Sequence, residues 1–167
     1  MKKLLLSLAL ITSFTVAATA QTYMTRTGKV YFNATTKSSP EKIEAKNNEV
    51  ATILDAKTGD LRFQVLIKNF KFERELMQEH FNENYMETEQ FPSAIFKGKI
   101  NEKIDWTKDG EYKVTVTGKL NMHGVEKERT IDGTVTVKGS EITINSKFKV
   151  HIADHNIKVP TLYVENI

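Results

Sequence analysis

The sequence predicts an all-β fold: an antiparallel β-barrel into which one amphipathic helix is inserted at about residues 73–86. Two observations carry this prediction. Most of the chain alternates apolar and polar residues in long runs separated by short turns, which is typical of an antiparallel meander with one apolar face. One stretch changes to helical spacing instead, and Pro92 ends it. A long twisted meander normally closes into a barrel, because closure removes unpaired strand edges.

The first twenty residues are expected to be a cleaved signal peptide. Lys2 and Lys3 precede an apolar run over residues 4–16 that is too short to span a membrane comfortably, and Ala18-Thr19-Ala20 matches a cleavage site. The alternative, an uncleaved membrane anchor, is disfavoured by the short run. Cleavage near Ala20-Gln21 leaves one domain over residues 21–167 and places the protein in the periplasm or outside the cell.

Composition narrows the classes of partner. Removal of residues 1–20 takes away two lysines and no acidic residue, so the formal charge falls from +3 to +1. A nearly neutral protein has no overall basic field that would steer it to nucleic acid. Cysteine is absent, so stability should come from a packed core rather than from disulfides, and a thiol nucleophile is excluded.

The first strands are expected over residues 29–35 and 43–54, with a break at Ser38-Ser39-Pro40. Asn47-Asn48 predicts a turn that divides the second segment into a pair of strands, because asparagine tolerates positive φ. A further turn is expected at residues 57–60.

The next strand, residues 60–72, changes the face on which its apolar residues lie. A single extra residue near Lys68-Asn69 would return all of them to one face, so we predict a β-bulge there. The alternative is a strand end that is apolar on both faces, with one face under the helix. The apolar residues concerned are Leu61, Phe63, Val65 and Ile67 on one parity and Phe70 and Phe72 on the other.

In the helical stretch, one face is apolar and the other is polar. The polar face is Glu79, Asn82 and Glu83, which suits solvent. The residues of the opposite face recur at helical spacing: Leu76, Met77, His80, Phe81, Asn84 and Tyr85.

After Pro92, strands are expected over residues 94–104, 111–122, 125–138 and 142–152. Their turns are residues 108–110, His123-Gly124 and Gly139-Ser140. Small residues recur on the inward face, which leaves space, and a barrel of about eight strands can hold one small ligand. These small residues are Gly98, Gly118, Gly133 and Ser146.

Catalytic patterns are absent from the sequence. It contains no G-x-S-x-G, P-loop or G-x-G-x-x-G motif. His80 is interpreted as a structural residue beside the apolar helix face, and His123 as a turn residue. His151 and His155 lie on an extended segment, where their spacing does not converge, so they are expected on the surface. We therefore predict a non-enzymatic protein without a metal site or cofactor.

What the sequence does offer is a set of apolar side chains for the barrel interior. The pattern alone predicts a filled core and a ligand cavity equally well, because both use the same residue types. The flexible methionines slightly favour a ligand-binding protein. The candidate ligand-binding residues are Phe63, Val65, Ile67, Phe70, Phe72, Leu76, Met77, Phe81, Tyr85, Phe91, Phe96, Val116, Leu120, Met122 and Phe148.

These residues also resemble a known family. The chain is similar to the YceI-like family in Phe70-x-Phe72-x-Arg74-x-Leu76-Met77-x-x-His80-Phe81-Asn82-Glu83-Asn84-Tyr85-Met86-Glu87, in Phe91-Pro92-x-Ala94-x-Phe96-x-Gly98, in Gly118-x-Leu120-x-Met122-His123-Gly124-Val125 and in Ile157-x-Val159-Pro160. The resemblance implies an extended, lipocalin-like antiparallel barrel in an exported bacterial protein. Family members usually continue past the Val-Pro segment into a strand that helps close the barrel. This chain stops at Ile167, so either closure is incomplete or the sequence is truncated.

The resemblance implies an exported carrier of a long-chain lipid, such as a polyisoprenoid, held in the barrel interior. One alternative is a protein-interaction module that uses the helix and loop over residues 73–92. A lipid-modifying enzyme ranks below both alternatives, since only the histidines could act as its catalytic residues. An open barrel edge would also allow a homodimer.

Overall fold

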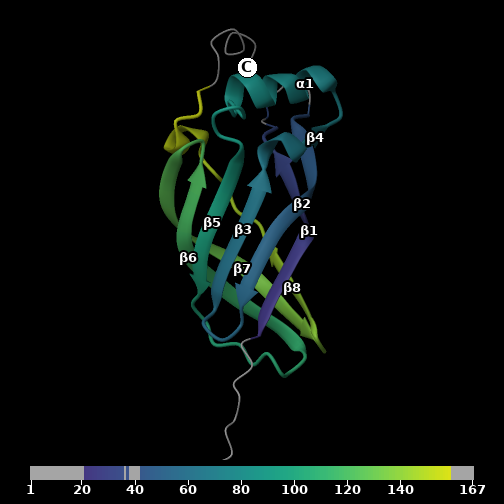
Figure 1. Ribbon diagram of the computed structural model, residues 1–167, viewed down its shortest axis with the longest axis vertical. Helices are drawn as coiled ribbons and strands as arrows, with labels where there is room; N and C mark the ends of the chain where they lie inside the picture. The colour runs from purple at the N-terminus through teal and green to yellow at the C-terminus, as the bar shows by residue number, and fades with distance from the viewer. Residues whose placement is uncertain (1–20, 36, 38–41, 159–167) are drawn as a thin grey trace, which may run out of the picture.

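The structure, a computed structural model, describes residues 21–35, 37 and 42–158; the expected signal peptide over residues 1–20 lies outside these ranges. The strands form one twisted sheet that curls into a nearly closed barrel, with the helical segment across one end (Figure 1). The elements are β1 (Thr22–Asn33), β2 (Glu44–Asp55), β3 (Asp60–Leu66), the 3-10 helix η1 (Ile67–Asn69), β4 (Lys71–Phe72), α1 (Glu75–His80), the π-helix η2 (Phe81–Tyr85), β5 (Ser93–Ile100), β6 (Gly110–Met122), β7 (Val125–Lys138), β8 (Glu141–Ser146) and the 3-10 helix η3 (Ile152–His155).

The strand order confirms the predicted antiparallel meander. Neighbours in the sheet are β1-β2-β3-β5-β6-β7-β8, and β4 pairs with the first half of β2. Among the described residues β1 and β8 do not pair with each other, which leaves a seam in the barrel. The expectation about a closing strand concerns the last residues of the chain, and residues 159–167 lie outside the described ranges.

Inside the barrel, the apolar faces of the strands form two clusters. The far-end cluster, away from the helix, consists of Leu54, Leu61, Phe96, Ile100, Val114, Val116, Leu120, Ile131, Val135 and Val137. The helix-end cluster consists of Ala45, Val50, Val65, Ile67, Phe70, Met86, Ala94 and Ile157. Phe63 and Met122 are half-buried and pack against both clusters, so they join the two halves of the interior.

The turn predicted at Asn47-Asn48 is wrong, because β2 runs straight through both residues. Asn47 is completely buried. Its side-chain oxygen accepts the Glu49 backbone N–H at 2.9 Å, and its amide donates to the Leu66 carbonyl at 3.0 Å. The pairing register between β1 and β2 shifts at this point. The asparagine therefore supports a bulge within the strand rather than a reversal of the chain.

The change of apolar face at the end of β3 is confirmed, but the β-bulge predicted near Lys68-Asn69 is wrong. The turn η1 occupies residues 67–69 instead. It is closed by the Phe70 backbone N–H, which donates to the Ile67 carbonyl at 3.1 Å. The three residues of this turn do not pair with β2, and pairing resumes at β4. Phe70, which follows the turn, is buried in the interior.

The helix agrees with its prediction apart from its ends and its type, because α1 continues as the π-helix η2 as far as Tyr85. The strand predicted over residues 142–152 ends early, at Ser146. Beyond that point a side chain replaces backbone pairing, since the guanidinium of Arg129 on β7 donates to the Lys149 carbonyl at 3.2 Å.

Candidate functional site

Four phenylalanine rings gather inside the barrel beneath the helical segment. The centroid of Phe32 on β1 lies 6.1 Å from Phe70, 6.3 Å from Phe72 and 5.5 Å from Phe81. The rings of Phe72 on β4 and Phe81 on η2 are 4.9 Å apart. These tilted and edge-to-face arrangements are the ones that aromatic pairs prefer. We call these four residues the aromatic cluster.

Most rings of the aromatic cluster keep part of their surface exposed. Phe32, Phe72 and Phe81 are only half-buried, as is the neighbouring Tyr85, although all four pack against the helix-end cluster. The far-end cluster also has half-buried neighbours, among them Tyr23, Trp106 and Tyr112. Inward apolar rings that keep exposed area are the kind of surface on which apolar ligands bind. At the helix end three such half-buried rings, those of Phe32, Phe72 and Phe81, contact one another, which makes this end the better candidate for binding an apolar ligand.

The helical segment changes type between His80 and Phe81, where α1 gives way to the π-helix η2. In η2 the Met86 backbone N–H donates to the Phe81 carbonyl at 2.9 Å, which widens the last turn. Met77, Phe81 and Tyr85 follow one another at intervals of four residues and are half-buried, and Met86 is buried. Leu76 does not belong to this inner face, because its side chain is 54% exposed.

The structure distributes the fifteen candidate ligand-binding residues over three environments. The buried ones are Val65, Ile67, Phe70, Phe96, Val116 and Leu120. The half-buried ones are Phe63, Phe72, Met77, Phe81, Tyr85, Phe91 and Met122. Leu76 and Phe148 are exposed. Phe148 follows the early end of β8, so strand alternation no longer directs it inward.

Two polar contacts involve η1, which immediately precedes Phe70 of the aromatic cluster. The Lys68 ammonium on η1 forms an ion pair with Glu89, which follows the helical segment, and this contact lowers the pKa of the Glu89 carboxyl. The side chain of Asn69 donates to Glu49 on β2 at 2.6 Å. Both contacts are exposed, so each contributes little stability, but together they connect η1 to the elements on either side.

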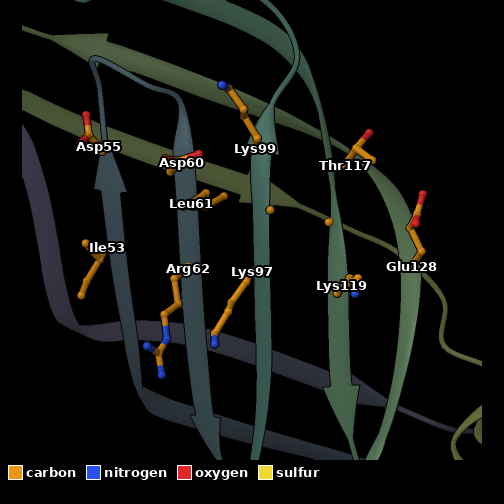
Figure 2. A pocket seen from close by; sticks show the side chains of 12 residues that line it. Ile53, Asp55, Asp60, Leu61, Arg62, Lys97, Lys99, Thr117, Lys119 and Glu128 are labelled. Atoms are coloured by element: carbon orange, nitrogen blue, oxygen red, sulfur yellow. The ribbon is translucent and has the colours of Figure 1, made fainter.

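A hollow of about 750 Å³ lies outside the barrel, on the outer face of the sheet (Figure 2). Charged side chains project around it from β3, β5 and β6, including Arg62, Lys97, Lys99 and Lys119. Four cationic side chains therefore surround this hollow, whereas the aromatic cluster inside the barrel consists of phenylalanine rings.

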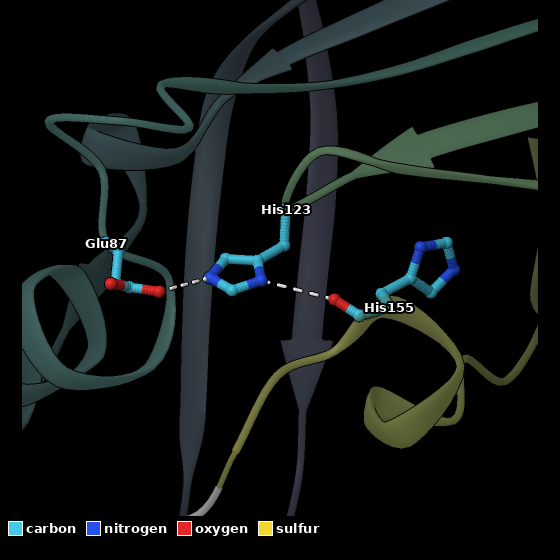
Figure 3. Close-up of polar contacts among 3 residues, drawn as sticks. All are labelled: Glu87, His123 and His155. Carbon is cyan, nitrogen blue, oxygen red and sulfur yellow. Dashed lines mark hydrogen bonds and ion pairs between the residues drawn. The ribbon is translucent and has the colours of Figure 1, made fainter.

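A second buried feature joins three distant segments through His123 (Figure 3). Its Nε2 lies 2.8 Å from Oε2 of Glu87, in the loop after the helix, and its Nδ1 lies 3.2 Å from the carbonyl oxygen of His155 on η3. The ring is 8% exposed, and the ring of Phe91 packs on it with centroids 4.4 Å apart. We call Glu87, His123 and His155 the histidine network.

Hydrogen-bond chemistry fixes part of the proton arrangement in this network. The His155 carbonyl can only accept, so Nδ1 of His123 carries a hydrogen and donates to it. One proton also lies between Nε2 and Glu87, as an ion pair if it resides on nitrogen and as a neutral hydrogen bond if it resides on oxygen. Both ring nitrogens are therefore occupied, and the ring ties the helix loop to the C-terminal turn.

The sequence interpretation missed most of this network. His123 does serve its turn as predicted, with φ of 52° followed by 73° at Gly124. The prediction that His155 lies on the surface is wrong, because it is completely buried and its Nδ1 lies 3.0 Å from the Val125 carbonyl. His151 is exposed, as predicted. The positive φ of 44° at Glu87 is a further sign of a constrained loop.

The described residues contain neither a candidate metal site nor a helix that could span a membrane. No group of three or more histidine, aspartate or glutamate side chains is arranged so that it could hold a metal ion. Within the same residues, every helix is too short or too polar to cross a bilayer.

Comparisons with known proteins agree with one another. A family model described as YceI-like domain matches residues 12–166. A polyisoprenoid binding domain from Saccharophagus degradans, implicated in plant cell wall breakdown, has a similar structure with a TM-score of 0.69 at 11% identity, covering 83% of this chain and 82% of that one. BcnA of Burkholderia cenocepacia gives a TM-score of 0.63 at 16% identity, with 83% of each chain covered.

A YceI protein of Campylobacter jejuni gives a TM-score of 0.52 at 16% identity, covering 99% of this chain and 92% of that one. No curated protein matches the sequence. At these identities the structural likeness shows a shared barrel fold.

Proposed function

We propose that this chain, which belongs to the YceI-like domain family, binds a long-chain apolar lipid such as a polyisoprenoid inside its barrel and carries it without chemical change. The observation that carries the proposal is the aromatic cluster, because three of its four rings, those of Phe32, Phe72 and Phe81, pack together under the helix yet remain half-buried. The structurally similar domain from Saccharophagus degradans is described as polyisoprenoid binding, which supports the same ligand class here.

The lipid would bind mainly by partition of its hydrocarbon chain from water into the apolar interior of the barrel. Burial of a hydrocarbon chain contributes about 0.8 kcal/mol per CH₂, so a long lipid needs few hydrogen bonds to bind tightly. The half-buried side chains Phe63 and Met122 touch both clusters, so their rotation would open this interior towards the far end. We further propose that the carrier works in the periplasm or outside the cell, because the leader carries Lys2, Lys3 and a cleavage pattern at Ala18–Ala20.

The first prediction concerns Phe81. Protein purified from a bacterial host should release a lipid in stoichiometric amount on hexane extraction, as identified by mass spectrometry. Phe81→Ser should weaken binding of a fluorescent long-chain polyisoprenoid by at least about tenfold, since it removes a ring worth about 2 kcal/mol of apolar contact. Leu66→Ser is the control, because Leu66 is 45% exposed on β3 and belongs to neither cluster.

Two results would contradict the carrier function. One is repeated extracts without stoichiometric lipid. The other is equal lipid binding by Phe81→Ser, Met77→Gln and wild-type protein, with circular dichroism showing that all three fold.

The second candidate function is docking of a partner protein on the helix. It is favoured by Leu76, which is 54% exposed on α1, and by the exposed Glu79 and Glu83 nearby. Glu79→Lys combined with Glu83→Lys should abolish capture of such a partner and leave the lipid content intact. Loss of lipid with unchanged partner capture would favour the carrier function alone.

A further inference from the structure

The hollow on the outer face lies over a row of like charges. The pairing register places Arg62 of β3 opposite Lys97 of β5, and Lys97 opposite Lys119 of β6. Lys99 lies two residues along β5 on the same face. Adjacent strands are about 4.8 Å apart, so the charged groups of Arg62 and Lys97 can reach one small ligand. Figure 2 shows Arg62 and Lys97 side by side, pointing the same way.

Like charges directly opposite each other destabilise a sheet, so this row should have compensation nearby. Lys119 has it, because its ammonium lies 2.9 Å from Glu126 on β7, and Glu128 is its cross-strand neighbour. For Arg62 and Lys97, by contrast, no hydrogen bond or ion pair joins either side chain to any residue that the structure describes. The cross-strand neighbour of Arg62 on its other side is the apolar Ile53.

The acidic residues at the edge of the hollow have other partners. Asp55 accepts the backbone N–H groups of Lys57 and Thr58 at 2.8 and 3.2 Å. Asp60 accepts the hydroxyl of Thr58 at 2.8 Å. Both carboxylates thereby stabilise the turn between β2 and β3, and Asp60 also lies directly opposite Lys99 in the sheet. Of the cationic residues in the hollow, Arg62 and Lys97 are the two without an acidic cross-strand neighbour.

We propose that this hollow is a binding site for a phosphate-bearing anion, held by Arg62 and Lys97. A guanidinium offers two parallel N–H donors to phosphate oxygens, and a lysine adds a mobile point charge. A phosphate bridging the two would supply the opposite charge that the row lacks. The site lies on the outside of the barrel, so its occupation does not depend on a lipid in the barrel interior.

The test uses inorganic pyrophosphate as the probe and the full chain as the protein. Isothermal titration calorimetry should show one site per chain. Arg62→Gln combined with Lys97→Gln should weaken pyrophosphate binding by at least about tenfold, since it removes the charge-assisted hydrogen bonds. The matched control is Lys113→Gln combined with Lys147→Gln, which removes the same charge from another hollow, lined also by Glu102 and Asp132.

A second arm separates two sources of phosphate. The wild-type protein is tested for co-sedimentation with phosphatidylglycerol vesicles. If it co-sediments and only Arg62→Gln/Lys97→Gln abolishes this binding, the site is assigned to a lipid headgroup. Pyrophosphate binding without vesicle binding would assign it to a free phosphorylated compound, and either outcome supports the site. Absence of binding in both arms would overturn the proposal, and so would an equal loss in the Lys113→Gln/Lys147→Gln control.

Discussion

Gly118→Ala should lower the free energy of unfolding by about 3 kcal/mol, near the upper end of the range for overpacked sites. Gly118 on β6 pairs directly with Gly98 on β5. A Cβ added at Gly118 would lie 2.3 Å from the Cα of Gly98 and 2.3 Å from the carbonyl oxygen of Lys97. Both obstacles are backbone atoms, so neither can rotate away, and the two strands would have to separate.

Urea denaturation followed by circular dichroism measures this effect as a lower midpoint at unchanged slope. Gly110→Ala is the control, because its added Cβ would meet only the ring of Tyr112, at 3.7 Å. That variant should unfold at the wild-type midpoint or slightly above it, since alanine restricts the unfolded chain. Equal midpoints for Gly118→Ala and Gly110→Ala would show that β5 and β6 tolerate a side chain at their closest approach.

The parts of the fold that the sequence predicts well are those fixed by local periodicity. Residues 111–122 alternate without interruption, and β6 spans Gly110–Met122. His123-Gly124 is a hairpin signal, and both residues have the positive φ that such a turn requires. The helical spacing after residue 73 likewise appears as α1 and η2. In each case neighbouring residues contain the whole signal, so no distant contact is needed to read it.

The errors arise where a distant partner decides the local structure. Asn47 has the composition of a turn, but its amide binds the carbonyl of Leu66, nineteen residues further along the chain, which keeps it inside a strand. Alternation continues through Phe148 in the sequence, yet β8 ends at Ser146 and Phe148 is 40% exposed. Periodicity identifies inward residues, but it does not show where strand pairing stops.

The same limit applies to the candidate site. Residue type and spacing selected Phe72 and Phe81, which do lie together in the aromatic cluster. They did not select Phe32, whose strand meets the others only through the sheet order β1-β2-β3. Nor could they show which inward side chains keep exposed area, because that depends on packing across the barrel.

His123→Asn should lower the free energy of unfolding by about 2 kcal/mol, even though asparagine is the better residue for this turn. The substitution keeps a side chain that tolerates the φ of 52° found at this position. It removes the hydrogen bonds to Glu87 and to the His155 carbonyl, which are 36 and 32 residues away in sequence. It also leaves a gap beneath the ring of Phe91. If His123 served only its turn, His123→Asn would raise the free energy of unfolding. Because His123 also links two distant segments, we expect the substitution to lower it.

Hydrogen exchange adds a local readout to the denaturation midpoint. If the histidine network holds the helix loop to the C-terminal turn, His123→Asn should speed amide exchange around Glu87–Phe91 and around His155, while the far-end cluster keeps its protection. His151→Asn is the matched control, since His151 is exposed on the same C-terminal segment, and its free energy of unfolding should stay within about 0.5 kcal/mol of wild type. A His123→Asn protein as stable as wild type, with unchanged exchange at both places, would reduce His123 to a turn residue. Faster exchange at both places would show that the network holds the loop after the helix to the C-terminal turn.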